Sequence, residues 1–217
     1  MTKAVIFDMD GVISDTQKLH AAVESELLAR RGITMTPEEI TGKYTGTEDH
    51  HMFSEVFSMH GVEEALEVVL AEKWPLIRKR AAEGIEAIDG VTELIQALRG
   101  QDYQVGVASS SPLDFIGEVL GQLNLTELFH ALTSGEEVEE GKPDPAIFLL
   151  AAERLEVAPQ YCLVIEDGRP GMEGAKEAGM KCIGLVEDTR GDYPADYLVD
   201  SLRYVSPEVI EQLLATA

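Results

Sequence analysis

The stretch Ala4-Val5-Ile6-Phe7-Asp8-Met9-Asp10-Gly11-Val12 joins an apolar strand to two acidic residues. Its first four residues are apolar and include β-branched and aromatic side chains, which is typical of a parallel strand covered on both faces. Two carboxylates and a glycine follow at once, so the strand would present Asp8 and Asp10 at its carboxyl end. Open α/β sheets bind ligands at that edge. We therefore predict a functional site where this strand ends.

From Gly90 onward, strand-like and helical patterns alternate. Strands are expected at 103–108, 129–133, 161–165, 180–185 and 197–199, with helices at 91–98, 112–123, 145–155 and 171–178 and a last helix from Ser206. Alternation of this kind predicts a parallel sheet with helices on both faces and right-handed crossovers. The expected fold class is α/β, with a Rossmann-like doubly wound parallel sheet as its core.

The segment between the first strand and Gly90 has a helical pattern throughout. Thr36-Pro37-Glu38-Glu39 has the features of a helix start: a capping Thr, a Pro at the first helical position and acids in the first turn. A βαβ crossover needs only about a dozen residues, so this longer stretch indicates an inserted subdomain. We predict a catalytic core of residues 1–15 and 85–217 and an α-helical cap subdomain of residues 16–84, with hinges at 14–16 and 84–90.

The composition limits the partners of the chain. Its 217 residues include 17 Lys and Arg against 40 Asp and Glu, a net charge of −23. Such a field repels nucleic acid and anionic membranes, and neither is expected as a partner. A small anionic substrate is compatible with it, because distant charges are screened beyond about 8 Å. The sequence shows no leader and no apolar stretch near the ~20 residues of a membrane span, so a cytoplasmic protein is expected. The expected oligomeric state is a monomer or a small homo-oligomer.

The two cysteines, Cys162 and Cys182, both fall inside apolar strand-like runs. Without a CxxC pattern beside them, we expect buried, reduced thiols rather than a disulfide or metal ligands.

Polar residues follow four of the predicted strands. These are Asp8 and Asp10, then Ser109-Ser110-Ser111, then Gly141-Lys142-Pro143-Asp144-Pro145, and finally Glu166-Asp167. Each group alone has an ordinary explanation as a helix cap, a loop residue or a polar turn. Four such groups near the carboxyl ends of strands of one sheet favour a single site instead.

This ordered set resembles the haloacid dehalogenase-like superfamily, and the resemblance covers essentially the whole chain. Asp-x-Asp-Gly-Val, a Ser after a strand, Lys-Pro and Glu-Asp occur in the superfamily's order. The segment Phe7 to His20, with a helical insertion directly after it, is similar to the β-phosphoglucomutase-like phosphatases. The resemblance implies a Mg²⁺-dependent phosphatase that hydrolyses a small phosphorylated metabolite, such as a sugar phosphate, through an aspartyl-phosphate.

The acidic residues suit that chemistry. A phosphomonoester dianion repels an anionic nucleophile, so the site must cancel charge before a carboxylate reaches phosphorus. Asp8 is the expected nucleophile. Mg²⁺ prefers oxygen ligands, which Asp8, Asp10, Glu166 and Asp167 can supply. The resemblance implies that Asp10 offers its backbone carbonyl to the metal, and its side chain would then serve as the general acid and base.

The resemblance also assigns the phosphate contacts. Ser109 would donate its hydroxyl to a phosphoryl oxygen, and Lys142 would neutralise charge and restrain Asp8. Gly11 and Ser110 are expected beside the same phosphate. Gly168 departs from the family pattern, because relatives usually carry Ser or Thr there. This departure puts in doubt a hydrogen bond that would orient the metal ligands.

In the insertion, Thr16 and His20 lie four residues apart, at positions that relatives use to place the acid/base Asp. An ordinary surface helix explains them nearly as well. Gly42–His51 resembles the family's specificity loop, which makes Gly46 and Thr47 candidate substrate contacts, and Lys73 lies where relatives place a cap lysine.

The adjacent pair His50-His51 could suggest a metal site. Neighbouring histidines splay apart on a helix and lack a partner at i, i+4, so a solvated loop is expected instead.

Other functions of related sites agree less well with this sequence than simple hydrolysis does. A β-phosphoglucomutase-type mutase must bind a second phosphate in the cap. Here Thr47-Glu48-Asp49 contains two acids and no Arg, and the acids would repel that phosphate. Hydrolysis is therefore favoured, and a mutase reaction is the alternative. A haloacid dehalogenase does not need a second acid or Mg²⁺, so the presence of Asp10 and Asp167 argues against that function. A response-regulator receiver is shorter and has no cap, and a binding protein that has lost catalysis would lack one of the four motifs.

Overall fold

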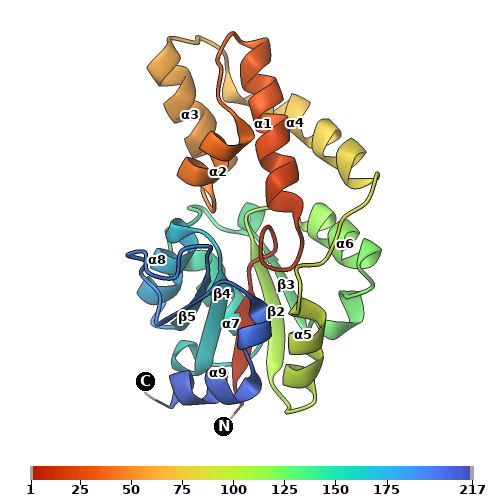
Figure 1. Ribbon diagram of the computed structural model, residues 1–217, viewed down its shortest axis with the longest axis vertical. Helices are drawn as coiled ribbons and strands as arrows, with labels where there is room; N and C mark the ends of the chain where they lie inside the picture. Colours follow the sequence, from red (N-terminus) through yellow and green to blue (C-terminus); the bar gives the residue numbers. More distant parts are fainter. Residues whose placement is uncertain (1, 216–217) are drawn as a thin grey trace.

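The computed structural model describes residues 2–215, whose strands form one parallel sheet (Figure 1). The strands are β1 (Ala4–Phe7), β2 (Gln104–Ser109), β3 (Ala131–Ser134), β4 (Cys162–Glu166), β5 (Lys181–Leu185) and β6 (Tyr197–Val199). They pair in the order β3-β2-β1-β4-β5-β6, and every pair is parallel. The chain winds outward in both directions from the centre, so the topological switch point lies at β1. The predicted α/β, doubly wound fold is confirmed.

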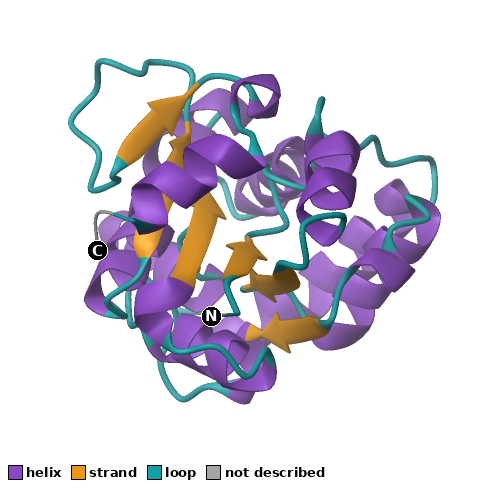
Figure 2. Cartoon of the chain, turned by 90° about the horizontal axis from the view of Figure 1, so that it is seen from below, coloured by secondary structure: helices purple, strands orange, loops and turns teal. Residues whose placement is uncertain are grey.

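The side chains of β1 alternate between two apolar layers. Val5 and Phe7 join the layer that includes α5 (Val91–Arg99), α6 (Leu113–Gln122) and α9 (Pro207–Leu214). Ala4 and Ile6 join the layer that includes α7 (Ala146–Arg154) and α8 (Arg169–Glu177). Figure 2 shows the sheet from below, with helices on both sides. All four β1 residues are fully buried, which explains the uninterrupted apolar run.

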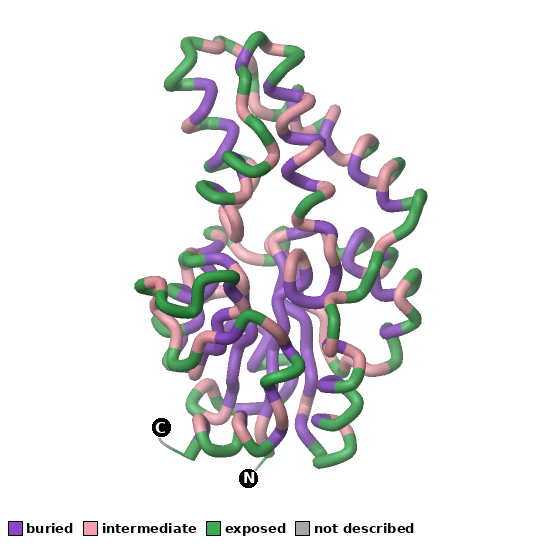
Figure 3. The backbone as a smooth tube through the Cα atoms, in the orientation of Figure 1, coloured by how far each residue is buried: buried purple, intermediate pink, exposed green. Residues whose placement is uncertain are grey.

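Five helices lie between β1 and β2, and the first four of them form a separate group. These four are α1 (Thr16–Arg30), α2 (Pro37–Tyr44), α3 (Asp49–His60) and α4 (Leu66–Ala81). They gather beyond the carboxyl ends of the strands (Figure 1), and their inward faces are buried (Figure 3). Val23, Phe53, Val69 and Ile77 form part of the apolar contact between these helices. We refer to residues 16–81 as the four-helix region.

The predicted helix start at Thr36 is confirmed as a capping box. The hydroxyl of Thr36 accepts a hydrogen bond from the backbone N–H of Glu39 at 3.2 Å, and the Glu39 carboxylate accepts one from the N–H of Thr36 at 2.8 Å. These bonds satisfy two donors that would otherwise be unpaired near the helix N-terminus.

The two connections between the sheet and the four-helix region lie side by side. The backbone N–H of Asp15 donates to the carbonyl of Glu86 at 3.0 Å, and that of Ile88 donates to the carbonyl of Ile13 at 2.9 Å. Ser14 and Ala87 form an isolated antiparallel bridge between them. The chain therefore leaves and re-enters the sheet layer through one paired link.

Several smaller expectations can also be compared. Cys162 and Cys182 are buried free thiols, as predicted. The strand expected at 129–133 begins two residues later, and the helix expected at 171–178 begins at Arg169. Short 3-10 helices lie at Thr126–Leu128, Gly135–Glu137, Pro159–Tyr161 and Leu202–Tyr204. Within residues 2–215, every helix is too short or too polar to cross a membrane.

Candidate active site

The first two acids project from a tight turn at the end of β1. The backbone N–H of Asp8 donates to the carbonyl of Ile165 at 3.0 Å, which continues the pairing with β4 by one residue. The chain then folds back, with the N–H of Gly11 donating to the carbonyl of Ser14 at 2.8 Å. Asp8 is thereby fixed beside the end of β4, at the sheet edge where a ligand site was predicted.

Lys142 joins the acids of two strands. Its Nζ donates to Oδ1 of Asp8 at 2.5 Å, to Oε1 of Glu166 at 2.8 Å and to the carbonyl of Ala108 at 3.2 Å. Burial would lower the pKa of Lys142, but the two carboxylates outweigh this effect and raise the pKa above its ordinary value. The ammonium group therefore stays charged in a buried position.

Asp167 completes a crowded group of carboxylates. Gly11 has a φ of +89°, and a Cβ at that position would lie 2.1 Å from Oδ2 of Asp167, so this carboxylate rests directly against the Asp8–Gly11 turn. Burial is the main reason that the pKa of Asp167 is raised, with Glu166 and Asp8 adding to it. Burial also raises the pKa of Asp8 to about 8, although Lys142 opposes this. A divalent cation bound by oxygen atoms would relieve such repulsion.

Glu166 is engaged differently from Asp8 and Asp167. One of its carboxylate oxygens accepts from Lys142, and the other accepts from the backbone N–H of Gly168 at 2.6 Å. The backbone amide thus orients Glu166 even though residue 168 has no side chain. The carboxylates of Asp8 and Asp167 could hold a metal ion directly, with Glu166 behind them.

Asp10 is held by side chains from two parts of the chain. Its Oδ1 accepts from the hydroxyl of Thr16 at 2.5 Å and lies 3.6 Å from Nε2 of His20. Its Oδ2 accepts from the hydroxyls of Ser111 at 3.0 Å and Ser109 at 3.3 Å. The structure therefore brings Thr16 and His20 to Asp10, where the family resemblance placed them.

Two residues expected beside the phosphate, Ser109 and Gly11, have bonds to other parts of the chain. Ser109 is fully buried with its hydroxyl directed at Asp10, whereas Ser110 and Ser111 line the adjoining cavity. The N–H of Gly11 is already bonded to Ser14, and Gly11 instead makes room for Asp167. Ser111 was missed as a functional candidate, although the run of three serines after β2 was visible.

Comparison with known proteins agrees with this arrangement. The family model for haloacid dehalogenase-like hydrolases matches residues 5–185. The chain belongs to this family. Its relatives include the phosphorylated carbohydrates phosphatase of Thermotoga maritima, which is 30% identical over 98% of each chain. The β-phosphoglucomutase of Bacillus subtilis is 30% identical over 84% of this chain and 83% of its own length.

Solved structures give the same assignment. A crystal structure of β-phosphoglucomutase from Clostridium difficile matches with a TM-score of 0.86 and 25% identity, covering 100% of this chain and 98% of the other. The family match therefore identifies the chain as a haloacid dehalogenase-like hydrolase, and its relatives include a named phosphatase.

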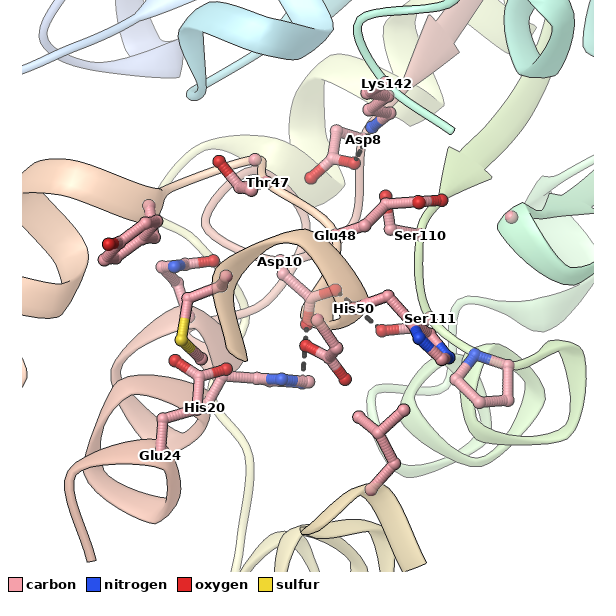
Figure 4. Close-up of a pocket in the computed structure, with 18 of the residues that line it drawn as sticks. Asp8, Asp10, His20, Glu24, Thr47, Glu48, His50, Ser110, Ser111 and Lys142 are labelled. Atoms are coloured by element: carbon pink, nitrogen blue, oxygen red, sulfur yellow. Dashed lines mark hydrogen bonds and ion pairs between the residues drawn. The ribbon is translucent and has the colours of Figure 1, made fainter. Parts of the chain in front are cut away.

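The site of this hydrolase opens into a cavity of about 300 Å³ between the sheet edge and the four-helix region (Figure 4). Asp8, Asp10 and Lys142 line one part of the cavity. Gly46 and Thr47, from the α2–α3 loop, line the facing part, as proposed from sequence. The predicted Asp and Lys motifs and the α2–α3 loop therefore meet in one space, which could hold a small ligand.

His50 and His51 are exposed, as predicted, but the prediction that they lie in a loop is wrong. Both residues lie in the first turn of α3, which begins at Asp49. His50 lines the cavity, and Nε2 of His51 lies 4.0 Å from Glu55. The pair was assigned to a loop because the α3 helix boundary was not recognised.

Lys73 does not line the cavity of the hydrolase. It is fully buried and donates to Oε1 of Glu24 at 2.6 Å and to Oδ1 of Asp49. These two carboxylates line the cavity instead; Asp49 was noted from the sequence as a cap acid, whereas Glu24 was not. The spacing of Glu24 four residues after His20 on one helix face was the available signal.

Proposed function

We propose that the protein is a Mg²⁺-dependent phosphatase that hydrolyses a small sugar or polyol phosphate through an aspartyl-phosphate on Asp8. The observation that carries the proposal is the Lys142 ammonium bonded to both Asp8 and Glu166, with Asp167 against the same turn. Asp8 lies beside one fixed cation, Lys142, and beside carboxylates that could hold a second, the metal ion. These positive charges would let the Asp8 carboxylate approach an anionic phosphate. Mg²⁺ at Asp8, Asp167 and the carbonyl of Asp10 would neutralise phosphoryl charge when bound.

The reaction would use two aspartates in sequence. Asp8 attacks phosphorus through one carboxylate oxygen, the bond from phosphorus to the alcohol oxygen breaks, and Asp10 donates a proton to the departing alkoxide. Asp10 then accepts a proton from a water molecule that attacks the phosphorus. Inorganic phosphate leaves, and the carboxylate of Asp8 is regenerated. The bonds from Thr16 and Ser111 would keep Asp10 in place for both proton transfers.

The four-helix region would act as a cap over this site. Its α2–α3 loop lines the cavity opposite Asp8, and the paired link at Ser14 and Ala87 is the natural hinge for movement of residues 16–84 relative to residues 1–15 and 85–217. Closure would keep bulk water away while Asp8 attacks the phosphate.

The test is phosphate release from a panel of small phosphomonoesters, with Mg²⁺ and after its removal by a chelator. Asp8→Asn should abolish release while the thermal transition is kept. Asp102→Asn is the matched control, because Asp102 is exposed and its φ of 61° suits Asn equally well. Full activity of Asp8→Asn, or full activity without a divalent ion, would remove the proposal.

Hydrolysis is favoured over a mutase reaction because of the acids on the cap side. Glu48 and Asp49 line the cavity where a mutase would hold a second phosphate. Like charges at such a position oppose binding. Conversion of β-glucose 1-phosphate to glucose 6-phosphate, primed by the bisphosphate and faster than phosphate release, would reverse this preference.

A further inference from the structure

The part of the cavity that lies away from Asp8 is lined by two carboxylates and an imidazole. His20 and Glu24 come from α1 and Asp49 from the start of α3, and one ligand atom of each lies within 4.8 Å of those of the other two. Figure 4 shows Asp8 and Lys142 at one end of the site and His20 and Glu24 at the other, with Asp10 between them. A ligand with its phosphate at Asp8 would present its other end to this cluster.

The charge of this cluster is only partly neutralised. Lys73 does not line the cavity and donates to both Glu24 and Asp49. Lys73, Glu24 and Asp49 together therefore carry a net charge of one negative unit. Burial would lower the pKa of Lys73, but its carboxylate partners outweigh this and raise it, which keeps the ammonium charged. Because Lys73 is buried and already bonded to both acids, it is not available to a second anion.

Hydrogen-bond acceptors remain free at this end. Each bond to Lys73 uses one carboxylate oxygen, and within residues 2–215 no partner is found for the second oxygen of Glu24 or of Asp49. Nε2 of His20 is also buried without a hydrogen-bond partner in that part of the chain, and it lies 3.6 Å from Oδ1 of Asp10. Carboxylate oxygens can only accept hydrogen bonds, so they require donors from a ligand.

We infer that the end of the substrate remote from its phosphate is uncharged and carries hydroxyl groups. Hydroxyls can donate to Glu24 and Asp49, whereas a carboxylate or second phosphate would meet like charge, since Lys73 is already bonded to both acids. Trp74 lines the same cavity and offers an apolar face to the carbon chain of a polyol. The inference rests on the proposed function, because it takes the phosphate to lie at Asp8.

Two ligands that differ only at that end provide the test. Sorbitol 6-phosphate and 6-phosphogluconate share a six-carbon chain, hydroxyl groups and one phosphate, but the far end is CH₂OH in the first and a carboxylate in the second. We expect kcat/KM to be at least about tenfold higher for sorbitol 6-phosphate. Equal values, or a preference for 6-phosphogluconate, would overturn the inference.

Variants assign the preference to the cluster. Glu24→Gln removes one negative charge while keeping the shape, so the ratio of the two kcat/KM values should fall severalfold. Glu26→Gln is the matched control: it lies on the same helix and pairs with Arg30 and Arg80 away from the cavity, so the ratio should stay as in the parent enzyme. An unchanged ratio in Glu24→Gln would argue against the assignment.

Binding separates this inference from the proposed function. Calorimetry on the Asp8→Asn chain measures affinity for the same two ligands without turnover. If the parent enzyme releases no phosphate but Asp8→Asn binds sorbitol 6-phosphate more tightly, the phosphatase proposal fails and the inference stands. Equal affinities would overturn the inference even if hydrolysis is observed. Binding of two Mn²⁺ ions per chain, falling to one in Glu24→Gln, would also overturn it, because the cluster would then be a metal site.

Discussion

Gly46 and Gly168 lie in direct backbone contact between the α2–α3 loop and the loop before α8. A Cβ built on Gly168 would lie 2.7 Å from the Cα of Gly46 and 2.8 Å from the carbonyl oxygen of Thr45. The obstacles are backbone atoms, so they cannot yield as the end of a side chain could. Gly168 has a φ of −101°, which any residue can adopt. A glycine is therefore needed here because a side chain would not fit, and not because of the backbone conformation. Relatives usually carry Ser or Thr at this position, and the glycine found here allows the two loops to approach closely.

Gly168→Ser is accordingly expected to push the four-helix region away from the sheet edge. The closed arrangement would become less populated, so KM for a sugar phosphate should rise about tenfold, with a smaller loss in kcat. Steady-state kinetics and small-angle scattering measure the two effects. Gly121→Ala is the control, because a Cβ at Gly121 would meet no described atom within 4 Å apart from its chain neighbours and its own helix backbone. A Gly168→Ser enzyme with unchanged KM and radius of gyration would contradict this explanation.

The sheet-edge acids were predictable because parallel topology leaves few choices. Once Ala4–Phe7 and Cys162–Glu166 are recognised as strands, their carboxyl ends must share an edge, and the register Val5 to Leu163 brings Asp8 next to the end of β4. Sequence pattern and strand direction were sufficient for this part of the site.

The cap side of the cavity could not be predicted in the same way. Lys73, Glu24 and Asp49 come from three different helices, and their meeting depends on how α1, α3 and α4 pack together. Helical periodicity identifies a buried face but does not specify which residue of another helix it contacts. The direction of Ser109 toward Asp10 likewise depends on the turn after β2 and not on any residue pattern.

Lys142→Gln should both inactivate and destabilise the protein. Asp8 and Glu166 would lose their shared counter-charge in a buried site, at a cost of about 3 kcal/mol in the free energy of unfolding. Phosphate release should fall by at least about a hundredfold, because one source of charge neutralisation is removed. Urea unfolding and a phosphate assay measure the two effects. Lys176→Gln, which removes a partly exposed ion pair with Asp196, should cost less than about 1 kcal/mol.

Thr16→Val should impair the enzyme through Asp10. The substitution keeps the branched shape but removes the hydroxyl that donates to Oδ1 of Asp10 at 2.5 Å. With Asp10 less well oriented for proton transfer, kcat should fall about tenfold while KM changes little. Thr16→Ser restores a hydroxyl and should recover most of the loss. If the Ser and Val variants lose kcat equally, the hydrogen bond to Asp10 is not the reason for the effect.

The pair of Glu137 and Arg154 should make stability depend on pH. Arg154 donates to both carboxylate oxygens of Glu137, at 2.7 and 2.8 Å, and the backbone N–H of Ser134 also donates to it at 2.9 Å. The hydrogen bonds from Arg154 are the main reason that the pKa of Glu137 falls to about 2 from an ordinary value of 4.5. A lowered folded-state pKa stabilises the fold above the unfolded-state pKa, and this stabilisation is lost as the pH falls toward 2.

Glu137→Gln should therefore lower the free energy of unfolding by about 1 kcal/mol at pH 7, a modest value because the side chain is partly exposed to solvent. The difference between parent and variant should shrink as the pH falls below 4.5, since the parent Glu137 then gains its proton more readily in the unfolded chain. Urea unfolding of both proteins across the range in which they fold measures this difference. Glu139→Gln, at an exposed neighbouring position, controls for the change in net charge. A difference that stays constant or grows with acidification would show that the ion pair does not stabilise the fold.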